Sequence, residues 1–388
     1  MTGGQPPPAI ARAGVVLAVL QFAFALTWIV YAAFLPALAA QVGLARSVVP
    51  WILLADQAIF LVCDWLAGVF ADRVGDAVAR LGRWIAGVAL VSCAAFLALP
   101  LVAPAGSAPV LAAVVVVWSA SSSILRAPPL ALAGRHASRP QRTWLAGGYA
   151  LGLAAAGAVA PYLGRALVAV DPRIPFAATS VVVAASVLVL AGLPLGAAPA
   201  TRRAGAPGSL AGLVAAVAVL AIGLQVHTAI ASSAIYLRFA PPEALADLLP
   251  VFWYGCAIAA LPAAPLVRRA GGLAVMAGAG AAGAAALAAC ALAGSRAAVV
   301  AAQAAAGLAW GATLTGAFAA ASSLERRPGA ATGLVFSVLA AATLARMAFA
   351  ASGAAAVPQV AAVMPLVPPV AWAIGAMIAG VLAVGRRD

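Results

Sequence analysis

Ionisable side chains are rare in this sequence, and a few of them stand inside long apolar segments. Asp56, His227 and Arg346 lie within such segments, and Arg126 stands just before Pro128-Pro129. A charge inside an apolar span is costly to keep, so each of these residues is a candidate for handling ions or protons. The chemistry we expect of them is ion pairing and reversible protonation, with no catalytic residue among them.

The segments that hold these residues are long enough to cross a membrane. Of the 388 residues, 66% are hydrophobic and 8% are charged, whereas soluble domains carry about 25% charged residues. Residues 13–45, 174–201 and 297–324 contain no charged side chain at all. A transmembrane helix needs about 20 apolar residues, because lipid offers the backbone no hydrogen bonds. We therefore expect an all-α integral membrane protein embedded in a lipid bilayer.

Clusters of Gly, Pro and Arg divide the chain into twelve expected helices. We expect two pseudo-symmetric six-helix bundles, in residues 1–195 and 209–388, joined by a cytoplasmic linker in residues 196–208. The expected helices lie near residues 13–40, 47–71, 84–103, 108–133, 143–168, 174–195, 209–238, 248–267, 271–294, 297–323, 329–353 and 362–385.

The arginines predict the orientation, because positive residues beside helix ends stay on the cytoplasmic side. With the N-terminus inside, 16 of the 22 arginines fall in cytoplasmic segments and five in outer ones, while Arg346 lies within a helix. Both termini are therefore expected in the cytoplasm, and the protein in the cell inner membrane. No small-residue cleavage site follows the start of the chain, so we expect an uncleaved first helix.

Composition and motifs also argue against several classes of protein. The net charge of +13 comes from scattered arginines that form no basic face, so no nucleic-acid partner is expected. The four cysteines lie in apolar spans without metal-ligand spacing. No phosphate-binding loop and no hydrolase motif is present. We expect no metal, no cofactor and no enzymatic activity, and a monomeric protein.

A short pattern recurs in the two expected halves. Tyr31-x-x-Phe34-x-Pro36 ends the first helix, and Tyr236-x-x-Phe239-x-Pro241 ends the seventh. Membrane folds built from duplicated halves place their binding site between the halves, near the bilayer midplane. The repeat therefore favours a site between the two bundles.

The most specific pattern ends the second expected helix and reads Asp64-x-x-x-Gly68-Val69-Phe70-Ala71-Asp72-Arg73-Val74-Gly75. Gly68 permits close approach of a neighbouring helix, and Asp72 can attract a helix N-terminus from the opposite half. The pattern resembles the G-x-x-x-D-R/K-x-G signature of the major facilitator superfamily, and the twelve-helix layout extends that resemblance over nearly the whole chain. The resemblance implies a secondary transporter with Asp64, Gly68, Asp72, Arg73 and Gly75 in a conformational gate.

In that superfamily, helices two and eleven meet across the interface between halves. Asp56 and Arg346 lie on these two helices at similar depths, in the expected outer half of the bilayer. We expect them to form a pair that closes the outer gate and opens when Asp56 is protonated. The alternative is that Asp56 only faces a wet cavity mouth. His227 is a further candidate proton carrier, although a lone helical His is also often just hydrogen-bonded to a neighbour.

Two further motifs each allow two interpretations. In the fifth helix, Gly157, Pro161 and Gly164 resemble the Gly/Pro motif of proton-driven exporters in the superfamily, but small residues at this spacing also serve helix packing. Arg126 could bind a carboxylate or phosphate at the break before Pro128-Pro129. It could also be a snorkelling arginine that marks the cytoplasmic boundary.

The first and seventh helices, which line the central cavity in the superfamily, carry most of the other polar side chains. With Arg126, we expect the cargo contacts to come from this set: Gln21, Thr27, Trp28, Tyr31, Gln225, His227, Thr228, Ser232, Ser233 and Tyr236.

The function expected from these observations is secondary active transport of a small solute, coupled to protons, by alternating access between two halves. The alternative is a membrane-embedded receptor, scaffold or enzyme without transport activity. The sequence identifies no cargo.

Overall fold

The computed structural model describes residues 8–74, 78–195, 209–324, 327–354 and 357–385. Every regular element in these ranges is a helix, and twelve stretches are long and apolar enough to cross a membrane. The expected all-α fold of twelve spans is thereby confirmed, while the expected linker, residues 196–208, lies outside the described residues. The spans are Pro8–Gln41, Arg46–Arg73, Arg80–Val102, Ala108–Arg135, Pro140–Ala166, Arg173–Gly192, Leu210–Tyr236, Pro242–Ala260, Gly272–Leu292, Arg296–Ser322, Pro328–Ala351 and Pro358–Val384.

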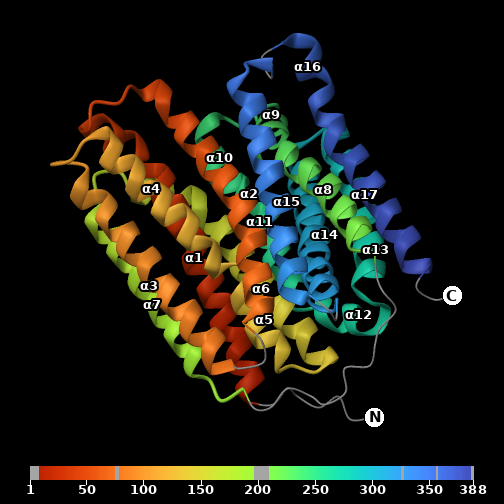
Figure 1. Ribbon diagram of the computed structural model, residues 1–388. Coiled ribbons are helices and arrows are strands. Elements are labelled where there is room, and N and C mark those ends of the chain that lie inside the picture. The colour runs from red at the N-terminus through yellow and green to blue at the C-terminus, as the bar shows by residue number, and fades with distance from the viewer. Residues whose placement is uncertain (1–7, 75–77, 196–208, 325–326, 355–356, 386–388) are drawn as a thin grey trace.

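The spans form two bundles that stand side by side (Figure 1). The N-terminal bundle contains α1 (Pro8–Gln41), α2 (Val49–Arg73), α3 (Val78–Val102), α4 (Ala108–Ser122), α5 (Ala127–Arg135), α6 (Arg139–Ala166) and α7 (Arg173–Gly192). The C-terminal bundle contains α8 (Leu210–Val226), α9 (Ser232–Tyr236), α10 (Leu245–Leu248), α11 (Pro250–Ala260), α12 (Ala263–Ala270), α13 (Gly272–Leu292), α14 (Arg296–Ser322), α15 (Pro328–Ala351), α16 (Pro358–Val363) and α17 (Val367–Val384).

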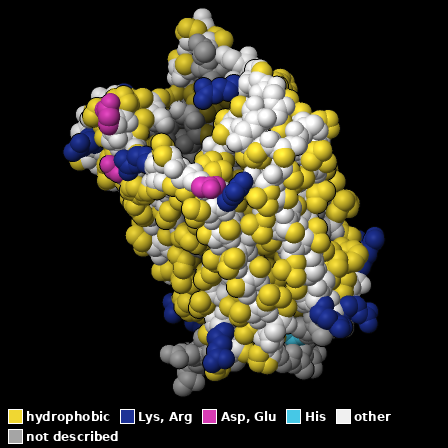
Figure 2. Space-filling view, turned by 90° about the vertical axis from the view of Figure 1, so that its left-hand side faces the viewer, with side chains coloured by type: hydrophobic (Ala, Val, Ile, Leu, Met, Phe, Trp, Pro, Cys, Tyr) yellow, Lys and Arg dark blue, Asp and Glu magenta, His cyan; other side chains and the backbone are white. Residues whose placement is uncertain are grey.

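Because twelve spans are an even number, α1 begins and α17 ends on the same side of the molecule, which we call the terminal side. Figure 2 shows a broad hydrophobic band around the middle, with charged side chains gathered toward the two ends. The surface in this view is hollowed at the end away from the termini, which we call the opposite side. An apolar band between two charged ends is the surface that a lipid bilayer requires.

The fourth span is broken where the sequence disfavours a continuous helix. A short 3₁₀ turn (Ser123–Leu125) joins α4 to α5, and the first turn of α5 contains Pro128 and Pro129. Proline has no backbone N–H to donate and pushes the chain before it away from helical angles. The break therefore falls at Arg126, with φ −97° and ψ −88°, as expected from the Pro-Pro pair.

The two bundles touch closely along α2 and α15, where glycines replace larger side chains. Gly68 of α2 lies against Gly329 of α15, so a Cβ atom at Gly68 would overlap the Gly329 carbonyl oxygen. One turn further along α15, a Cβ atom at Gly333 would overlap the Asp64 carbonyl oxygen. Small residues four apart let helix backbones approach in this way. The close approach expected of Gly68 is thus present, and the glycines that permit it on α15 are Gly329 and Gly333.

Other contacts between the bundles gather on the terminal side. Arg142 of α6 donates to the Ser322 carbonyl at 3.4 Å, and the Tyr149 ring packs on Phe318 and Phe336 at 5.0 and 5.5 Å between centroids. On the opposite side, the bundles meet through exposed groups: Arg165 of α6 pairs with Asp247 of α10 at 3.1 Å, and the Tyr254 hydroxyl of α11 donates to that of Tyr162 at 3.2 Å. Exposed ion pairs contribute little stability. The terminal side is therefore the more tightly closed of the two.

The glycine contact can be tested by adding one methyl group. We expect Gly68→Ala to destabilise the protein by about 1–3 kcal/mol, because the new Cβ meets backbone that can only move if the helices separate. Gly278→Ala in α13 is the matched control, since its Cβ would meet nothing within 4 Å. Thermal unfolding of the two purified variants in detergent provides the comparison. Equal unfolding temperatures would show that α2 and α15 do not pack as described.

Candidate functional site

Asp72, at the terminal end of α2, binds the first turn of a helix from the other bundle. Its carboxylate accepts the backbone N–H groups of Gly329 at 2.9 Å and Ala330 at 2.8 Å. Arg135 of α5 donates to the same carboxylate at 3.3 Å. The first N–H groups of a helix lack partners inside it and carry partial positive charge. Asp72 therefore caps α15 across the interface, which is the contact expected of it. Arg73 is exposed in the last turn of α2, and Gly75 lies outside the described residues.

Asp64, two turns further into the same face of α2, forms a buried ion pair. Arg126 Nη1 lies 2.6 Å from Asp64 Oδ2, and the Asp64 side chain is fully buried while that of Arg126 is 16% exposed. The guanidinium also lies over the rings of Phe60, at 4.1 Å from the centroid, and Phe24, at 5.4 Å. Arg126 therefore points into the bundle, and the expectation that it snorkels to the boundary is wrong.

The break in the fourth span is held open by side chains from two other helices. Gln21 Nε2 of α1 donates to the Leu125 carbonyl at 2.5 Å, and the Tyr149 hydroxyl of α6 donates to the Arg126 carbonyl at 3.2 Å. A helix break frees carbonyl groups that must find other partners when water is excluded. Gln21 and Tyr149 provide those partners, and the break in turn directs the Arg126 side chain toward Asp64.

Three oxygen atoms at this break have no hydrogen-bond partner among the described residues. They are Asp64 Oδ1, Gln21 Oε1 and Ser123 Oγ, and all three are buried. Buried polar atoms without partners are few in native structures and each calls for an explanation, such as an unseen water or ligand.

Asp56 lies toward the opposite side of α2, surrounded by aromatic rings. Tyr31 Oη donates to its carboxylate at 2.8 Å and Ser119 Oγ at 2.6 Å, and both donors are neutral. The rings of Trp28 and Trp118 pack on Tyr31 at 5.6 and 4.6 Å. Asp56 is completely buried, so it does not face a wet cavity mouth. Its hydrogen-bond partners are hydroxyl groups and not an arginine.

Arg346 has a different partner from the one expected. Its Nε donates to Gln225 Oε1 at 3.1 Å, and Gln225 Nε2 donates to Thr343 at 2.9 Å. The pair between Asp56 and Arg346 is therefore absent from this structure. The physical reason is that each charge finds neutral hydrogen-bonding groups within its own bundle.

His227 belongs to a polar chain within the C-terminal bundle. It opens a π turn (His227–Ala231) between α8 and α9, and such turns are frequent at functional sites. His227 Nε2 lies 2.8 Å from Gln303 Oε1, and Gln303 Nε2 donates to Ser232 Oγ at 2.5 Å. His227 donates in this contact when its Nε2 carries the proton.

The remaining expected cargo residues are spread over both bundles. Tyr236 is fully buried with no partner for its hydroxyl among the described residues, and Ser233 is half-buried. Thr27 and Thr228 bond carbonyls within their own helices. The structure thus gathers the expected residues in separate clusters: Gln21 near Arg126, Tyr31 and Trp28 with Asp56, Gln225 with Arg346, and His227 with Ser232.

In the fifth span, Gly157 faces the other bundle, and a Cβ atom there would lie 2.5 Å from the Trp253 ring. Pro161 lies within α6, while Gly164 is exposed with open space around it. For Gly157, close packing against α11 is therefore the role that the contacts describe.

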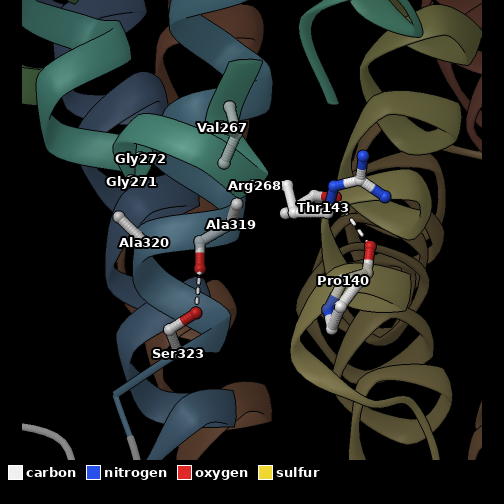
Figure 3. Close-up of a pocket in the computed structure, with 9 residues that line it drawn as sticks. All are labelled: Pro140, Thr143, Val267, Arg268, Gly271, Gly272, Ala319, Ala320 and Ser323. Carbon is white, nitrogen blue, oxygen red and sulfur yellow. Dashed lines mark hydrogen bonds between the residues drawn. The ribbon is translucent and has the colours of Figure 1, made fainter. Parts of the chain in front are cut away.

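A separate cavity of about 290 Å³ opens on the terminal side, between α6, α12 and the end of α14 (Figure 3). The Arg268 side chain extends toward α6, and the Thr143 and Ser323 hydroxyls are bonded to the carbonyls of Pro140 and Ala319. The cavity is distinct from these polar clusters. It is lined by Pro140, Thr143, Val267, Arg268, Gly271, Gly272, Ala319, Ala320 and Ser323.

The fold of twelve spans in two bundles is shared with solved structures of major facilitator superfamily transporters. The chain is similar to the human organic anion transporter MFSD10, with a TM-score of 0.68 at 12% identity, covering 97% of this chain and 99% of that one. It is also similar to the superfamily transporter FucP in its outward conformation, with a TM-score of 0.66 at 13% identity over 96% and 99% of the two chains.

A bacterial homologue of the iron transporter ferroportin, in its outward-facing state, gives a TM-score of 0.66 at 16% identity over 97% of this chain and 99% of the other. By sequence, no protein-family model and no curated protein matches. The likeness therefore establishes the fold, as the motif at the end of α2 predicts, and leaves the cargo to be argued from the site.

The ion pair of Asp64 can be tested through stability. We expect Arg126→Gln to destabilise the protein by about 3–5 kcal/mol, because it leaves a fully buried carboxylate without its counter-charge. Adding Asp64→Asn should recover most of this loss. Unfolding of both variants in detergent measures the difference, and a double variant as unstable as the single one would mean that the pair is not the source of the effect.

Proposed function

We propose that this protein is a secondary active transporter that carries a small solute across the membrane by alternating access between its two bundles. The observation that supports this most directly is the set of charged side chains kept inside apolar spans, at Asp56, Asp64, Arg126 and Arg346. Charges at such depth are costly and mark ion or substrate pathways. The fold shared with solved transporters points to the same function.

The structure corresponds to a state closed on the terminal side. The Asp72 cap and the Gly68 contact join α2 to α15 there, and the Tyr149 rings join α6 to α14 and α15. Two of the similar solved structures are described as outward. Transport then requires these contacts to break while the bundles close on the opposite side.

We assign the terminal side to the cytoplasm. The asymmetry of the arginines supports this orientation. With it, we propose that both termini lie in the cytoplasm, and that the protein is a monomer of the cell inner membrane.

Proton coupling is proposed at Asp56. Its two hydrogen-bond donors, Tyr31 and Ser119, are neutral, so an ionised Asp56 keeps a buried charge that no described cation compensates. Arg346 is in the converse situation in the other bundle, where neutral Gln225 is its hydrogen-bond partner among the described residues. When the opposite side closes, each charge can serve as the counter-ion of the other. The Asp56–Arg346 pair thus remains a proposal for that second state, and His227 remains a secondary candidate proton carrier.

Transport is tested in sealed proteoliposomes that contain a pH-sensitive dye. Solutes that stabilise the purified protein against heat are added outside, with and without an imposed pH gradient. We expect at least one of them to cause a change of internal pH. A solute that binds yet moves neither itself nor protons in this assay would favour a receptor or scaffold instead.

For the coupling site, we expect Asp56→Asn to keep solute binding and to lose at least about 90% of solute-driven proton movement, because the amide does not ionise and so cannot take up and release a proton. Asp171→Asn is the matched control, since Asp171 is an exposed carboxylate that accepts only the Arg173 N–H. Undiminished proton movement in Asp56→Asn would exclude Asp56 as the coupling residue.

A further inference from the structure

We propose that Asp64 and Arg126 form an exchange site for a small carboxylate: the Asp64 side chain occupies Arg126 in the empty protein, and a cargo carboxylate replaces it once Asp64 is protonated. This inference deepens the proposed function, on which its transport consequences rest. It assigns the cargo class and gives the break in the fourth span a purpose.

The first argument is the unused binding capacity of Arg126. A guanidinium carries five N–H donors, and only Nη1 has an acceptor on this side chain among the described residues. Charged guanidinium groups bind carboxylates most strongly through two parallel hydrogen bonds. Arg126 makes one such bond to Asp64 and keeps donors free for a second anionic group. The Arg126 side chain as a whole keeps 16% of its surface exposed.

The second argument is the incomplete bonding of Asp64. Its Oδ1 is buried without a hydrogen bond of ordinary geometry, and so are the oxygen atoms of Gln21 and Ser123 at the same break. The Ser123 hydroxyl is the neutral group nearest to this carboxylate. A structural ion pair would be expected to bond both carboxylate oxygens fully, since a buried oxygen without a partner is destabilising. The undersatisfied pair is therefore one that another ligand can displace.

The exchange keeps the site electrically balanced. Protonation converts the Asp64 carboxylate into a neutral carboxylic acid, and the Arg126 cation then lacks a counter-charge inside the bundle. An arriving carboxylate restores neutrality by binding Arg126. No covalent bond to the cargo forms or breaks. One proton and one anion therefore enter this site together, and the net charge of the site stays unchanged.

The rings beside the guanidinium define the body of the cargo. Phe60 and Phe24 lie over Arg126 at 4.1 and 5.4 Å, so an anion bound at Arg126 borders apolar surface. A carboxylate attached to a compact aromatic or aliphatic body fits this apolar environment. A strongly hydrated inorganic anion does not, because it would lose its water there.

The groups that face Asp64 are few, so a pH response can be assigned. Arg126 faces it from the break before α5, and Tyr149 of α6 bonds the Arg126 carbonyl. The neighbouring Cys63 lies on α2 itself, and α15 meets Asp64 through the Gly333 backbone. Arg126 is the counter-charge, so anion binding should strengthen as the pH falls and Asp64 gains its proton.

The test uses the purified full-length protein in detergent and three probes that share a benzene ring and differ in charge: anionic benzoate, neutral benzamide and cationic benzylamine. Binding is measured as the rise in unfolding temperature with probe concentration, in mildly acidic and mildly basic buffer. We expect benzoate alone to stabilise the wild type, and to do so more strongly in the acidic buffer.

Two variants then locate the site. Asp64→Asn should bind benzoate at least about tenfold more tightly than the wild type in basic buffer, because Arg126 is permanently released, a difference of about 1.4 kcal/mol, and its affinity should no longer depend on pH. The double variant Asp64→Asn with Arg126→Gln should fold and should not bind benzoate. Arg165→Gln with Asp247→Asn, at the exposed pair, is the control and should behave as the wild type.

The proposal is overturned if benzamide or benzylamine stabilises the wild type as well as benzoate does. It is equally overturned if Asp64→Asn shows no tighter binding, or if the double variant still binds. If benzoate binds as expected but no flux is seen in proteoliposomes, the transporter proposal is wrong while the carboxylate site stands. The two failures are therefore distinguishable.

Discussion

A charge cannot remain alone inside an apolar bundle, and this constraint explains much of the architecture around α2. Asp56, Asp64 and Asp72 follow one another at eight-residue intervals, and each step also turns about 80° around the helix axis. Asp64 and Asp72 therefore flank the side of α2 that carries Gly68, whereas Asp56 points into its own bundle. Each is compensated differently: Asp56 by two neutral hydroxyl groups, Asp64 by Arg126, and Asp72 by a helix N-terminus together with Arg135. The break in the fourth span exists in the position that lets Arg126 reach Asp64, and Gln21 and Tyr149 hold it there.

The same face of α2 also joins the two bundles. Gly68 lies between Asp64 and Asp72 and lets α15 approach, so these two aspartates and the glycine contact are parts of one interface. A change in the charge of Asp64 therefore occurs next to the backbone of α15, because Gly333 lies against the Asp64 carbonyl. Chemistry in the N-terminal bundle and movement of the C-terminal bundle are in this way adjacent, without a long chain of intermediates.

Much of the fold could be predicted from the sequence, and the site only in part. The twelve spans follow from apolar length, and the cap by Asp72 and the break before Pro128-Pro129 follow from local chemistry. Which residues pair with each other across space does not follow from the sequence. Arg126 could be expected at a boundary because nothing in the sequence connects it to Asp64, 62 residues away. Gln303, Ser119 and Tyr149 also escaped notice, since one polar residue in an Ala-rich helix gives no sign of its partner. Gly329 and Gly333, four residues apart at the start of the eleventh span (α15), could have been recognised in the sequence as a signal for close helix approach.

The cap on α15 has a consequence for how opening of the terminal side would be seen. Arg327, before the first residue of α15, supplies no side-chain cap of its own, so the amide hydrogens of Gly329 and Ala330 are shielded by a carboxylate from the other bundle. They exchange with deuterated water only when the bundles part there. The exchange rate of these two amides therefore reports how often the terminal side opens. Mass spectrometry can follow it without a covalent probe and without knowledge of the cargo.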